Sequence, residues 1–596
     1  MHWTRRASPY GAMACALVAL LGGCREPYPT PRFRGAGAQT PTRGGTFRFA
    51  FDTDVRSLDP HIAYDAVSGA GLHLVYETLV DYAPGTTELV PSLATRWDVS
   101  ADGREYTFHL RDGVRFHNGR RFTADDVRRS FERMLDPRRV PCPGTSFYRL
   151  IDGFDEFQAH TAPHVRGIAV LDPFTVRFRL TQADQTFLNI MAMPFAAAIA
   201  VEATEPASCA NAHDEAARFA CAARRDQFSR APVGTGPYRL ERWEQGARLV
   251  FARNESYWRP GRPYLDRIVL EMSLARHLQF MRFQHGDLEY AHNLSISTAD
   301  HVWVHQQPSW RPYIQDGPDI AMYGISMNAE IPPWNNVHLR RAVALAIDRE
   351  TMCRSRNYRI RPLGGVFPPG LPGYDEHLPN AQHYDIPAAR REMALAGYPH
   401  GLPGEHEFWM SEGPPAMIYG GLIQADLARI GVNIRLRIAS FAVFLENTER
   451  RHAVPMSFSA WSQDFPDPSN FTEILFHTRS IQDENSQNPS FYSNRVLDDL
   501  LDRARVEPSR STRTAMYQQA ERMIVDDAPW AFVYYPVNTE ITQPYVHNYV
   551  THPVWAYSVG DAWLDLPRRR WAERARRTRA NWSGLAALAL PWRWAP

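Results

Sequence analysis

The sequence contains no lysine, so arginine supplies all 66 of its fixed side-chain positive charges. This absence excludes chemistry that depends on a lysine amine, such as a Schiff base or a P-loop. We interpret it as codon bias of the genome. The arginines are balanced by 65 acidic residues, which leaves a formal net charge of +1. Such a balance gives no global field that would attract nucleic acid, and no nucleic-acid partner is expected.

The sequence also lacks the motifs by which common enzyme classes are identified. There is no GxSxG, no HExxH and no GxGxxG that follows a strand. His406 is followed by Glu407, but the second histidine of a zinc-protease motif is missing. No group of histidines and cysteines has zinc spacing. We therefore expect no enzyme activity, no metal and no cofactor, with a secreted hydrolase as the rival class.

The apolar run near the N-terminus, residues 11–21, is too short to cross a bilayer, which takes about 20 residues. Arg5 and Arg6 precede this run, and it ends in the sequence Leu-Gly-Gly before Cys24. The pattern is typical of a signal peptide over residues 1–23 that ends in a bacterial lipobox. In this interpretation Cys24 is acylated and anchors the mature protein to a membrane. The alternative is an ordinary signal peptide with a chance cysteine.

Two further segments near the ends show no apolar period. Residues 24–44 are rich in Pro, Gly, Thr and Arg, which favours a flexible tether behind the lipid anchor. Residues 567–596 form a basic, tryptophan-rich tail, which is expected to be either disordered or lying on the surface. We assign no function to this tail.

Cysteine is scarce, with six in the chain. Beyond Cys15 and Cys24 near the N-terminus, four remain. In an exported protein disulfides are expected, and Cys209 and Cys221 bracket a short alanine-rich segment. We predict that these two form a disulfide, which would stabilise the fold by about 3 kcal/mol on the chain-entropy description. For Cys142 and Cys353, buried free thiols are the alternative to a second bridge.

Short strands and helices alternate through the rest of the chain, which favours α/β lobes. The clearest strand has period-two alternation and is followed by Asp112-Gly113, and the clearest helix begins after a capping Thr123. The expected strands are 46–51, 106–110, 175–180, 248–253, 267–272, one that begins at 432, and 530–535. The expected helices are 66–80, 123–135, 337–349, 385–396, 424–430 and 513–526.

A series of short segments in a fixed order carries the functional signal. The main segments are 91–97 (PSLATRW), 106–111 (YTFHLR), 114–119 (VRFHNG), 122–127 (FTADDV), 232–238 (PVGTGPY), 253–258 (RNESYW), 326–328 (SMN), 340–350 (RRAVALAIDRE) and 461–468 (WSQDFPDP). This series resembles the extracytoplasmic solute-binding proteins of peptide and nickel ABC importers, the dipeptide- and oligopeptide-binding class. The resemblance covers about residues 44 to 545. Most of the segments have structural explanations, such as turns that need glycine at Gly234 and Gly236.

The resemblance implies an α/β fold of the two-lobed periplasmic-binding-protein type, class II, with an extra domain on the N-terminal lobe. It also implies a hinge that closes the lobes around the solute. The boundaries that follow are 45–80, 185–295 and 511–566 for lobe I, 81–184 for the extra domain, and 296–510 for lobe II.

The resemblance further implies a ligand site at Trp461 and Asp464. In the peptide-binding members the aspartate of a similar Trp-x-x-Asp segment pairs with the peptide α-amino group, and the tryptophan helps to wall a side-chain pocket. The chemistry is reasonable in itself, because a buried ammonium needs a carboxylate partner and charge-assisted hydrogen bonds are strong. The alternative is that Asp464 starts a turn and faces solvent. Asp467 is interpreted as a turn former.

The function implied is a binding protein of an ABC importer that captures peptides and delivers them to a membrane permease. Its expected partners are a peptide ligand, the permease subunits and a membrane that holds the lipid anchor, with the protein itself a monomer. Its expected location is the periplasm or the cell surface. Binders of nickel chelates, haem or oligosaccharides on the same fold stay open, as does a sensor without a transporter. The ligand carboxylate is expected to meet an arginine that the sequence does not single out.

Overall fold

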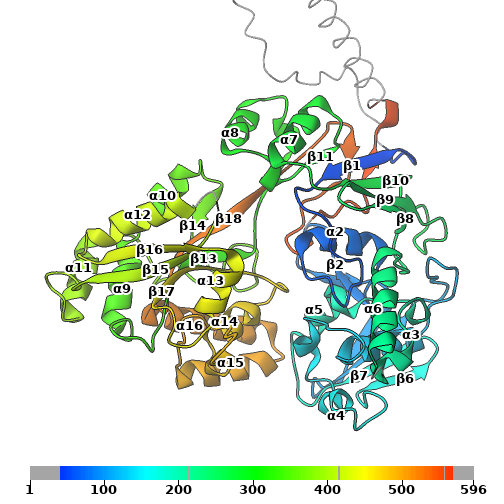
Figure 1. Cartoon of the computed structure of the whole chain (residues 1–596), viewed down its shortest axis with the longest axis horizontal. Coiled ribbons are helices and arrows are strands. Elements are labelled where there is room, and N and C mark those ends of the chain that lie inside the picture. Colours follow the sequence, from blue (N-terminus) through cyan, green and yellow to red (C-terminus); the bar gives the residue numbers. More distant parts are fainter. Residues whose placement is uncertain (1–39, 212–213, 414–415, 556, 568, 570–596) are drawn as a thin grey trace, which may run out of the picture.

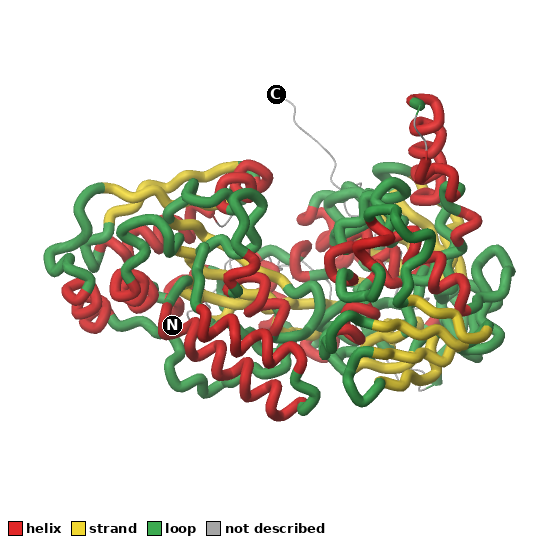
Figure 2. Tube along the Cα trace, turned by 90° about the horizontal axis from the view of Figure 1, so that it is seen from below, coloured by secondary structure: helices red, strands yellow, loops and turns green. Residues whose placement is uncertain are grey.

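The computed structural model describes residues 40–211, 214–413, 416–555, 557–567 and 569. These residues form two lobes that lie side by side, and a long diagonal strand, drawn in orange in Figure 1, runs from one lobe to the other. Figure 2 shows the same two lobes from below. The expected signal peptide with Cys24, most of the tether and most of the basic tail lie outside the described residues.

A four-stranded sheet forms the centre of the N-terminal lobe. Its order is β1 (Thr46–Ala50), β10 (Arg267–Glu271), β9 (Arg248–Arg253) and β8 (Tyr238–Glu244). β1 runs parallel to β10, and the other pairs are antiparallel. Alternate side chains such as Phe47 and Phe49 point into one core together with residues of α2 (Ala66–Val75). The same lobe contains α6 (Glu215–Arg230), α7 (Arg276–His285), α8 (Thr298–Gln306) and the short strands β19 (Val546–His547) and β20 (Trp563–Leu564).

The extra domain is an antiparallel sheet covered by a helix, at the lower right of Figure 1. Its strand order is β4 (Ala94–Val99), β5 (Glu105–Leu110), β7 (Thr175–Arg179) and β6 (Ile168–Asp172). The covering helix α3 (Ala124–Leu135) begins with a capping box between Thr123 and Asp126, as its sequence predicts. A short hairpin, β2 (Val80–Tyr82) with β3 (Leu89–Pro91), and the helices α4 (Phe154–Gln158) and α5 (Phe187–Ala192) complete this part.

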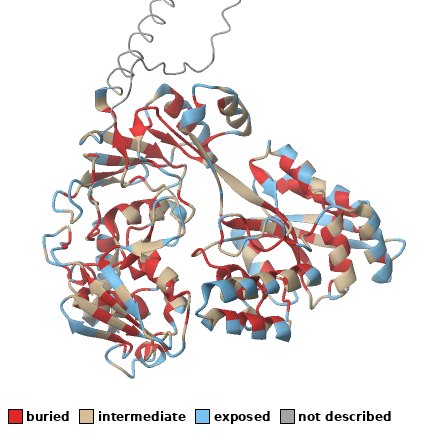
Figure 3. Ribbon diagram, turned by 180° about the vertical axis from the view of Figure 1, so that it is seen from behind, coloured by how far each residue is buried: buried red, intermediate tan, exposed pale blue. Residues whose placement is uncertain are grey.

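The second lobe is built on a mixed sheet with helices around it. The strands that belong to this lobe alone are β13 (Ala321–Met327), β14 (Ile360–Pro362), β15 (Glu405–Ser411), β16 (Asn433–Ala439) and β17 (Met456–Ser462). The helices are α9 (Val337–Ala346), α10 (Arg349–Ser355), α11 (Ile386–Leu395), α12 (Ala416–Ala428), α13 (Phe441–Thr448), α14 (Ser469–Phe476), α15 (Arg495–Val506) and α16 (Arg510–Asp527). Figure 3 shows that buried residues concentrate inside each lobe.

The strand β18 (Trp530–Thr542) connects the two lobes. Its first residues pair with β13 of the second lobe, and its last residues pair with β12 (Ile314–Pro318) and β11 (Tyr290–Ala291). One strand therefore belongs to both lobes. A crossing of this kind lets the lobes move about a hinge without breaking either core.

Packing corrects three of the expected boundaries. Val304 of α8 shares a core with Phe280 of α7 and with Ile541, and β12 pairs with the second half of β18, so residues 296–318 belong to lobe I rather than lobe II. Helix α16 and the start of β18 pack into a core with α14 and α15, so the segment from residue 511 to Phe532 belongs to lobe II rather than lobe I. Phe187, Ile190 and Met191 pack into the core of the extra domain, so that domain continues past residue 184. A chain that passes between lobes several times gives no compositional signal at each passage, which is why the sequence misplaced these points.

The two glycines of residues 232–238 are needed for a different reason from the one expected. Both have ordinary backbone angles, but a Cβ at Gly234 would lie 2.1 Å from the carbonyl oxygen of Val75, and a Cβ at Gly236 would lie 2.6 Å from that of Leu74. The turn therefore passes against the last turn of α2, and the N–H of Gly236 donates to Val75. This contact also explains why α2 ends at Val75 instead of residue 80.

Candidate functional site

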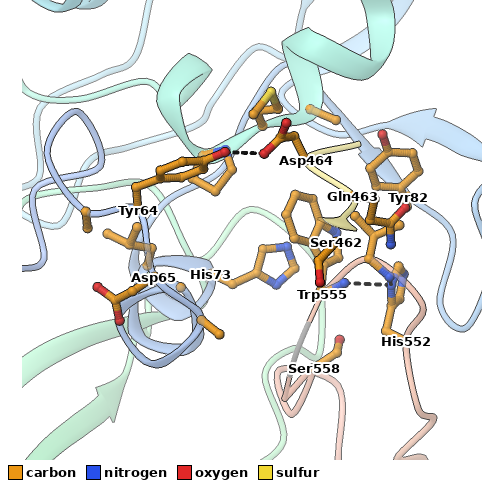
Figure 4. A pocket seen from close by; sticks show the side chains of 18 of the residues that line it. Tyr64, Asp65, His73, Tyr82, Ser462, Gln463, Asp464, His552, Trp555 and Ser558 are labelled. Carbon is orange, nitrogen blue, oxygen red and sulfur yellow. Dashed lines mark hydrogen bonds between the residues drawn. The ribbon is translucent and has the colours of Figure 1, made fainter. Parts of the chain in front are cut away.

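A cavity of about 1370 Å³ lies between the lobes. Its walls come from α2 and the loop before it, the hairpin β2–β3, the ends of β15 and β17, and the loop from residue 548 to 561. Figure 4 shows how Tyr64 and His73 of the first lobe, Gln463 and Asp464 of the second, and Trp555 of the loop converge on this space. Interlobe cavities lined by apolar walls with a few placed polar groups are the usual sites for small ligands.

Asp464 follows the end of β17 and is partly buried in the cavity wall. Its carboxylate accepts a hydrogen bond from the hydroxyl of Tyr64, which belongs to the opposite lobe. The amide of Asn470 donates to the other carboxylate oxygen at 2.9 Å, and the side-chain oxygen of Asn470 accepts from the Asp464 N–H at 2.8 Å. Both residues therefore fix the direction of the Asp464 carboxylate.

The Asp464 carboxylate has no cationic neighbour within 4.0 Å in the part of the chain that the structure describes. Burial raises its pKa above the usual value, and the hydrogen bonds from Asn470 and Tyr64 oppose this shift. A buried carboxylate held only by neutral donors is stabilised when a cation enters. The site can therefore accept a positively charged group from a ligand.

Trp461 lies three residues earlier, at the end of β17, and also lines the cavity. Its indole N–H donates to the side-chain oxygen of Asn470 at 3.3 Å. Asn470 thus connects Trp461 and Asp464, and the structure brings the two expected ligand residues to one wall. Sequence analysis did not single out Asn470 or Tyr64, because neither stands in a local pattern that would indicate contact with Asp464.

Asp467 forms the expected turn, since its carboxylate accepts from the N–H of Ser469 two residues later, and it also has a second role. Its buried carboxylate pairs with the guanidinium of Arg513 at 2.7 Å and also accepts from the N–H and hydroxyl of Ser469. Although burial opposes ionisation, Arg513 and Ser469 hold the pKa of Asp467 below its usual value. Asp467 therefore connects the first turn of α14 to α16 and is not available to a ligand.

Another polar group of the cavity is centred on His73. Its Nε2 lies 3.6 Å from the carboxylate of Asp81, which accepts from the indole N–H of Trp555 at 2.8 Å. Burial lowers the pKa of His73, but Asp81 outweighs this effect and the net result is a raised pKa. The ring of His73 also lies 4.8 Å from that of Trp555. A histidine with a carboxylate partner and an aromatic neighbour therefore lines the cavity beside the loop of Trp555 (Figure 4).

Glu77 adds a titratable carboxyl group to the same wall. It accepts from the hydroxyl of Tyr257 at 2.8 Å, the indole N–H of Trp258 at 3.0 Å and the hydroxyl of Thr235 at 2.9 Å. Burial raises the pKa of Glu77 to about 7, against the effect of these three donors. Trp258 packs against the core of the extra domain and is also a partly buried donor at the cavity.

Three arginines line the cavity, all from the N-terminal lobe and its extra domain. Arg262 pairs with Asp561 at 3.0 Å, and Arg259 lies 3.6 Å from the same carboxylate. The guanidinium of Arg111 stacks on the ring of Trp258 at 4.3 Å. Of the 66 arginines in the sequence, these three stand at the described cavity wall and are the candidates to bind a ligand carboxylate.

The lobes also contact each other directly beside the cavity. The ring of Phe465 packs into the core of the extra domain, next to Phe147. Arg505 of α15 pairs with Asp184 of the opposite lobe at 2.9 Å, and with Glu473 of its own lobe at 2.8 Å. These contacts hold the lobes together on the side where Asp464 lies.

Cys209 and Cys221 form a disulfide in the structure, with a Cα–Cα distance of 5.7 Å. The bridge connects a short 3₁₀ turn to α6. Cys142 and Cys353 are free thiols. In the described part of the chain, the helices are all too short or too polar to cross a membrane.

Comparison with known proteins places these features in a family. Residues 88–483 match the family described as bacterial extracellular solute-binding proteins, family 5. Di/tripeptide-binding protein 2 of Pseudomonas aeruginosa is 28% identical over 83% of this chain and 90% of its own length. Heme-binding protein A of Haemophilus influenzae is 27% identical over 90% of this chain and 96% of its own length.

Solved structures have the same fold. The periplasmic binding protein DppA of Helicobacter pylori, described in complex with the peptide STSA, superposes with a TM-score of 0.70 at 27% identity. The match covers 88% of this chain and 99% of DppA. This chain therefore has the two-lobed fold that its sequence predicted. The chain belongs to the family 5 bacterial extracellular solute-binding proteins.

Proposed function

We propose that this protein captures short peptides in the interlobe cavity and delivers them to an ABC importer. The observation that carries the proposal is Asp464, a partly buried carboxylate aimed into the cavity, whose partners among the described residues are all neutral donors. A peptide α-ammonium supplies the missing cation, and charge-assisted hydrogen bonds make this pair strong. The names of several relatives, which include di/tripeptide-binding proteins, agree with this choice.

The peptide carboxylate meets one of the three cavity arginines in this proposal. Arg111, Arg259 and Arg262 all lie on the first lobe, whereas Asp464 lies on the second. A ligand with opposite charges at its two ends would therefore contact both lobes. Such a ligand stabilises the closed arrangement, because it binds that arrangement better than the open one.

The direct test is mass spectrometry of ligand released from protein purified out of its native cells. The expected result is a set of short peptides with free amino termini. Haem, which a relative's name indicates as its ligand, would give a Soret absorbance band instead, and its recovery in place of peptides would overturn the proposal. Peptides recovered intact after incubation would also argue against the rival hydrolase.

The proposed anchor is tested separately. We propose that Cys24 is acylated after cleavage behind Gly23, which would attach the protein to a membrane through the tether. Membrane fractionation compares the wild type with Cys24→Ser. The variant is expected in the soluble fraction, and equal membrane association of both proteins would contradict the lipid anchor.

A further inference from the structure

Two histidines and an aspartate outside the cavity lie close together on the first lobe. His301 and His305 stand one turn apart on α8, and Asp316 lies on the neighbouring β12. One potential ligand atom from each residue lies within 4.8 Å of the others. The rings of the two histidines are 4.2 Å apart between centroids. Residues four apart on a helix share a face, so both imidazoles lie on the same side of α8.

We propose that His301, His305 and Asp316 bind a divalent transition-metal ion of the zinc class. Two imidazole nitrogens and one carboxylate oxygen suit zinc, nickel and cobalt better than calcium or magnesium, which prefer oxygen ligands. Three protein ligands leave one tetrahedral position for water. Asp316 is exposed and both histidines are partly exposed, so an ion can reach the site from solvent.

The hydrogen bonds around this cluster orient the ligand atoms. Nδ1 of His305 lies 2.8 Å from the backbone carbonyl of His301, which fixes the tautomer with hydrogen on Nδ1 and leaves Nε2 for an ion. One oxygen of Asp316 accepts from the hydroxyl of Thr539 at 2.6 Å, and the other faces His305. Supports of this kind, a histidine N–H on a carbonyl and a hydrogen-bonded carboxylate, are usual around metal ligands.

Only small side-chain rotations are needed for an ion to enter. His305 Nε2 and Asp316 now lie 2.8 Å apart, and His301 Nε2 lies 3.1 Å from the hydroxyl of Thr539. Around a tetrahedral ion with ligand bonds of about 2.0–2.1 Å, two ligand atoms are separated by about 3.3 Å. The distance between His305 Nε2 and Asp316 is near this value, and the ligand atom of His301 lies within 4.8 Å of both.

The position of the cluster connects it to the hinge. Asp316 stands on β12 and Thr539 on β18, the strand that both lobes share. Val304 of α8 packs into one core with Ile541 of β18. An ion would therefore fasten α8 to the lobe I end of the crossing strand. The cluster is separate from the residues that line the interlobe cavity, so the proposal does not depend on the nature of the solute.

The test uses Co²⁺ as a spectroscopic probe with tag-free, metal-stripped protein. The expected result is a visible d–d absorption band that saturates at one equivalent and is displaced by Zn²⁺. His305→Ala should abolish the band, whereas His383→Ala, an exposed histidine on the other lobe, should leave it unchanged. Thr539→Val should weaken binding about 10–100-fold, because it removes the support of Asp316 without removing a ligand.

Two outcomes would overturn the proposal. One is the absence of a saturable band in the wild type. The other is a band of equal strength in His305→Ala, since the ion would then be bound elsewhere. Circular dichroism of each variant, together with its peptide affinity, shows whether the variant is folded.

Discussion

Among single residues, Asp464 is distinguished by what surrounds it. Its carboxylate accepts from Tyr64 and Asn470, and burial raises its pKa. Asp467, three residues later, has an arginine partner and is already neutralised. The two aspartates share a sequence segment but differ in chemistry, because only one of them has been left without a cation in the described structure.

Replacing Asp464 should therefore affect binding far more than folding. Stranding one charge of a buried pair costs about 3–5 kcal/mol, so Asp464→Ala should weaken peptide binding by roughly 10²–10³-fold, as measured by calorimetry. Asp464→Asn should also bind poorly, because it keeps the shape but loses the charge. The matched control is Asp65→Asn, which removes a carboxylate from the cavity wall but retains the N-cap of α2. An equal loss of peptide affinity in Asp464→Asn and Asp65→Asn would indicate a general effect of cavity charge and not a specific role for Asp464.

The raised pKa of Glu77 leads us to expect that the free energy of unfolding depends on pH. Its pKa is about 7 in the folded protein and near 4.5 when unfolded, so the folded state holds the proton more firmly. Its contribution is fully present below about pH 4.5 and is lost as the pH rises through about 7. Glu77→Gln cannot lose a proton, so its melting temperature relative to that of the wild type should rise from pH 5 to about pH 7 and then level off. A difference between the two proteins that stays constant with pH would show that Glu77 does not titrate in this range.

The candidate site shows what sequence can predict at this scale. Trp461 and Asp464 were predicted from a motif, because they stand in one continuous segment. Tyr64 was not, since it lies 400 residues away and meets Asp464 only when the lobes come together. A contact that forms only when two lobes meet produces no regular spacing of residues that sequence analysis could detect.

Among the elements, helix α3 is attached to the first lobe through a buried arginine. Arg133 is fully buried, pairs with Asp59 at 2.6 Å and with Glu205 at 2.9 Å, and also contacts His61. Asp59 lies in the loop before α2, so this arginine connects the extra domain to the first lobe. Burial opposes its charge, but the two carboxylates keep its pKa raised.

Removing Arg133 should therefore be strongly destabilising. Arg133→Ala leaves the buried carboxylate of Asp59 without its arginine and leaves Glu205 with Arg139 alone, 3.5 Å away, and should cost about 3–5 kcal/mol of unfolding free energy, measured by urea denaturation. Arg128, on the same helix, pairs with Asp125 and Glu132 at the surface, and its replacement by alanine should cost about 0–1 kcal/mol. Similar losses for both variants would contradict the assigned role of the buried group.

The sequence predicted the limits of some helices and strands more accurately than those of others, for physical reasons. The helix at residues 124–135 was predicted well, because its cap and its apolar face are local signals. The crossing strand was expected to end at residue 535 but extends to Thr542, since its second half pairs with strands of the other lobe. Helix α12 begins at Ala416, before the expected start at residue 424. Elements whose limits depend on distant partners are the ones that sequence cannot delimit.

For the whole molecule, the arrangement of the lobes depends on few direct contacts. Arg505 joins α15 to Asp184 across the interface. Arg505→Gln should favour an open arrangement and weaken peptide binding, by about 1.5–3 kcal/mol if the charged hydrogen bond is lost. Small-angle scattering should then show a larger radius of gyration without peptide. Arg503→Gln on the exposed face of α15 is the control, and the same change in both variants would contradict a role for the interlobe pair.

The proposed function depends on Asp464 binding a peptide amino terminus inside the interlobe cavity. The most direct measurement is calorimetry of the wild-type protein with one short peptide in two forms, with a free and with an acetylated amino terminus. Acetylation should weaken binding by roughly 10²–10³-fold, because it removes the cation that Asp464 neutralises. Equal affinities for the two forms would contradict the claim.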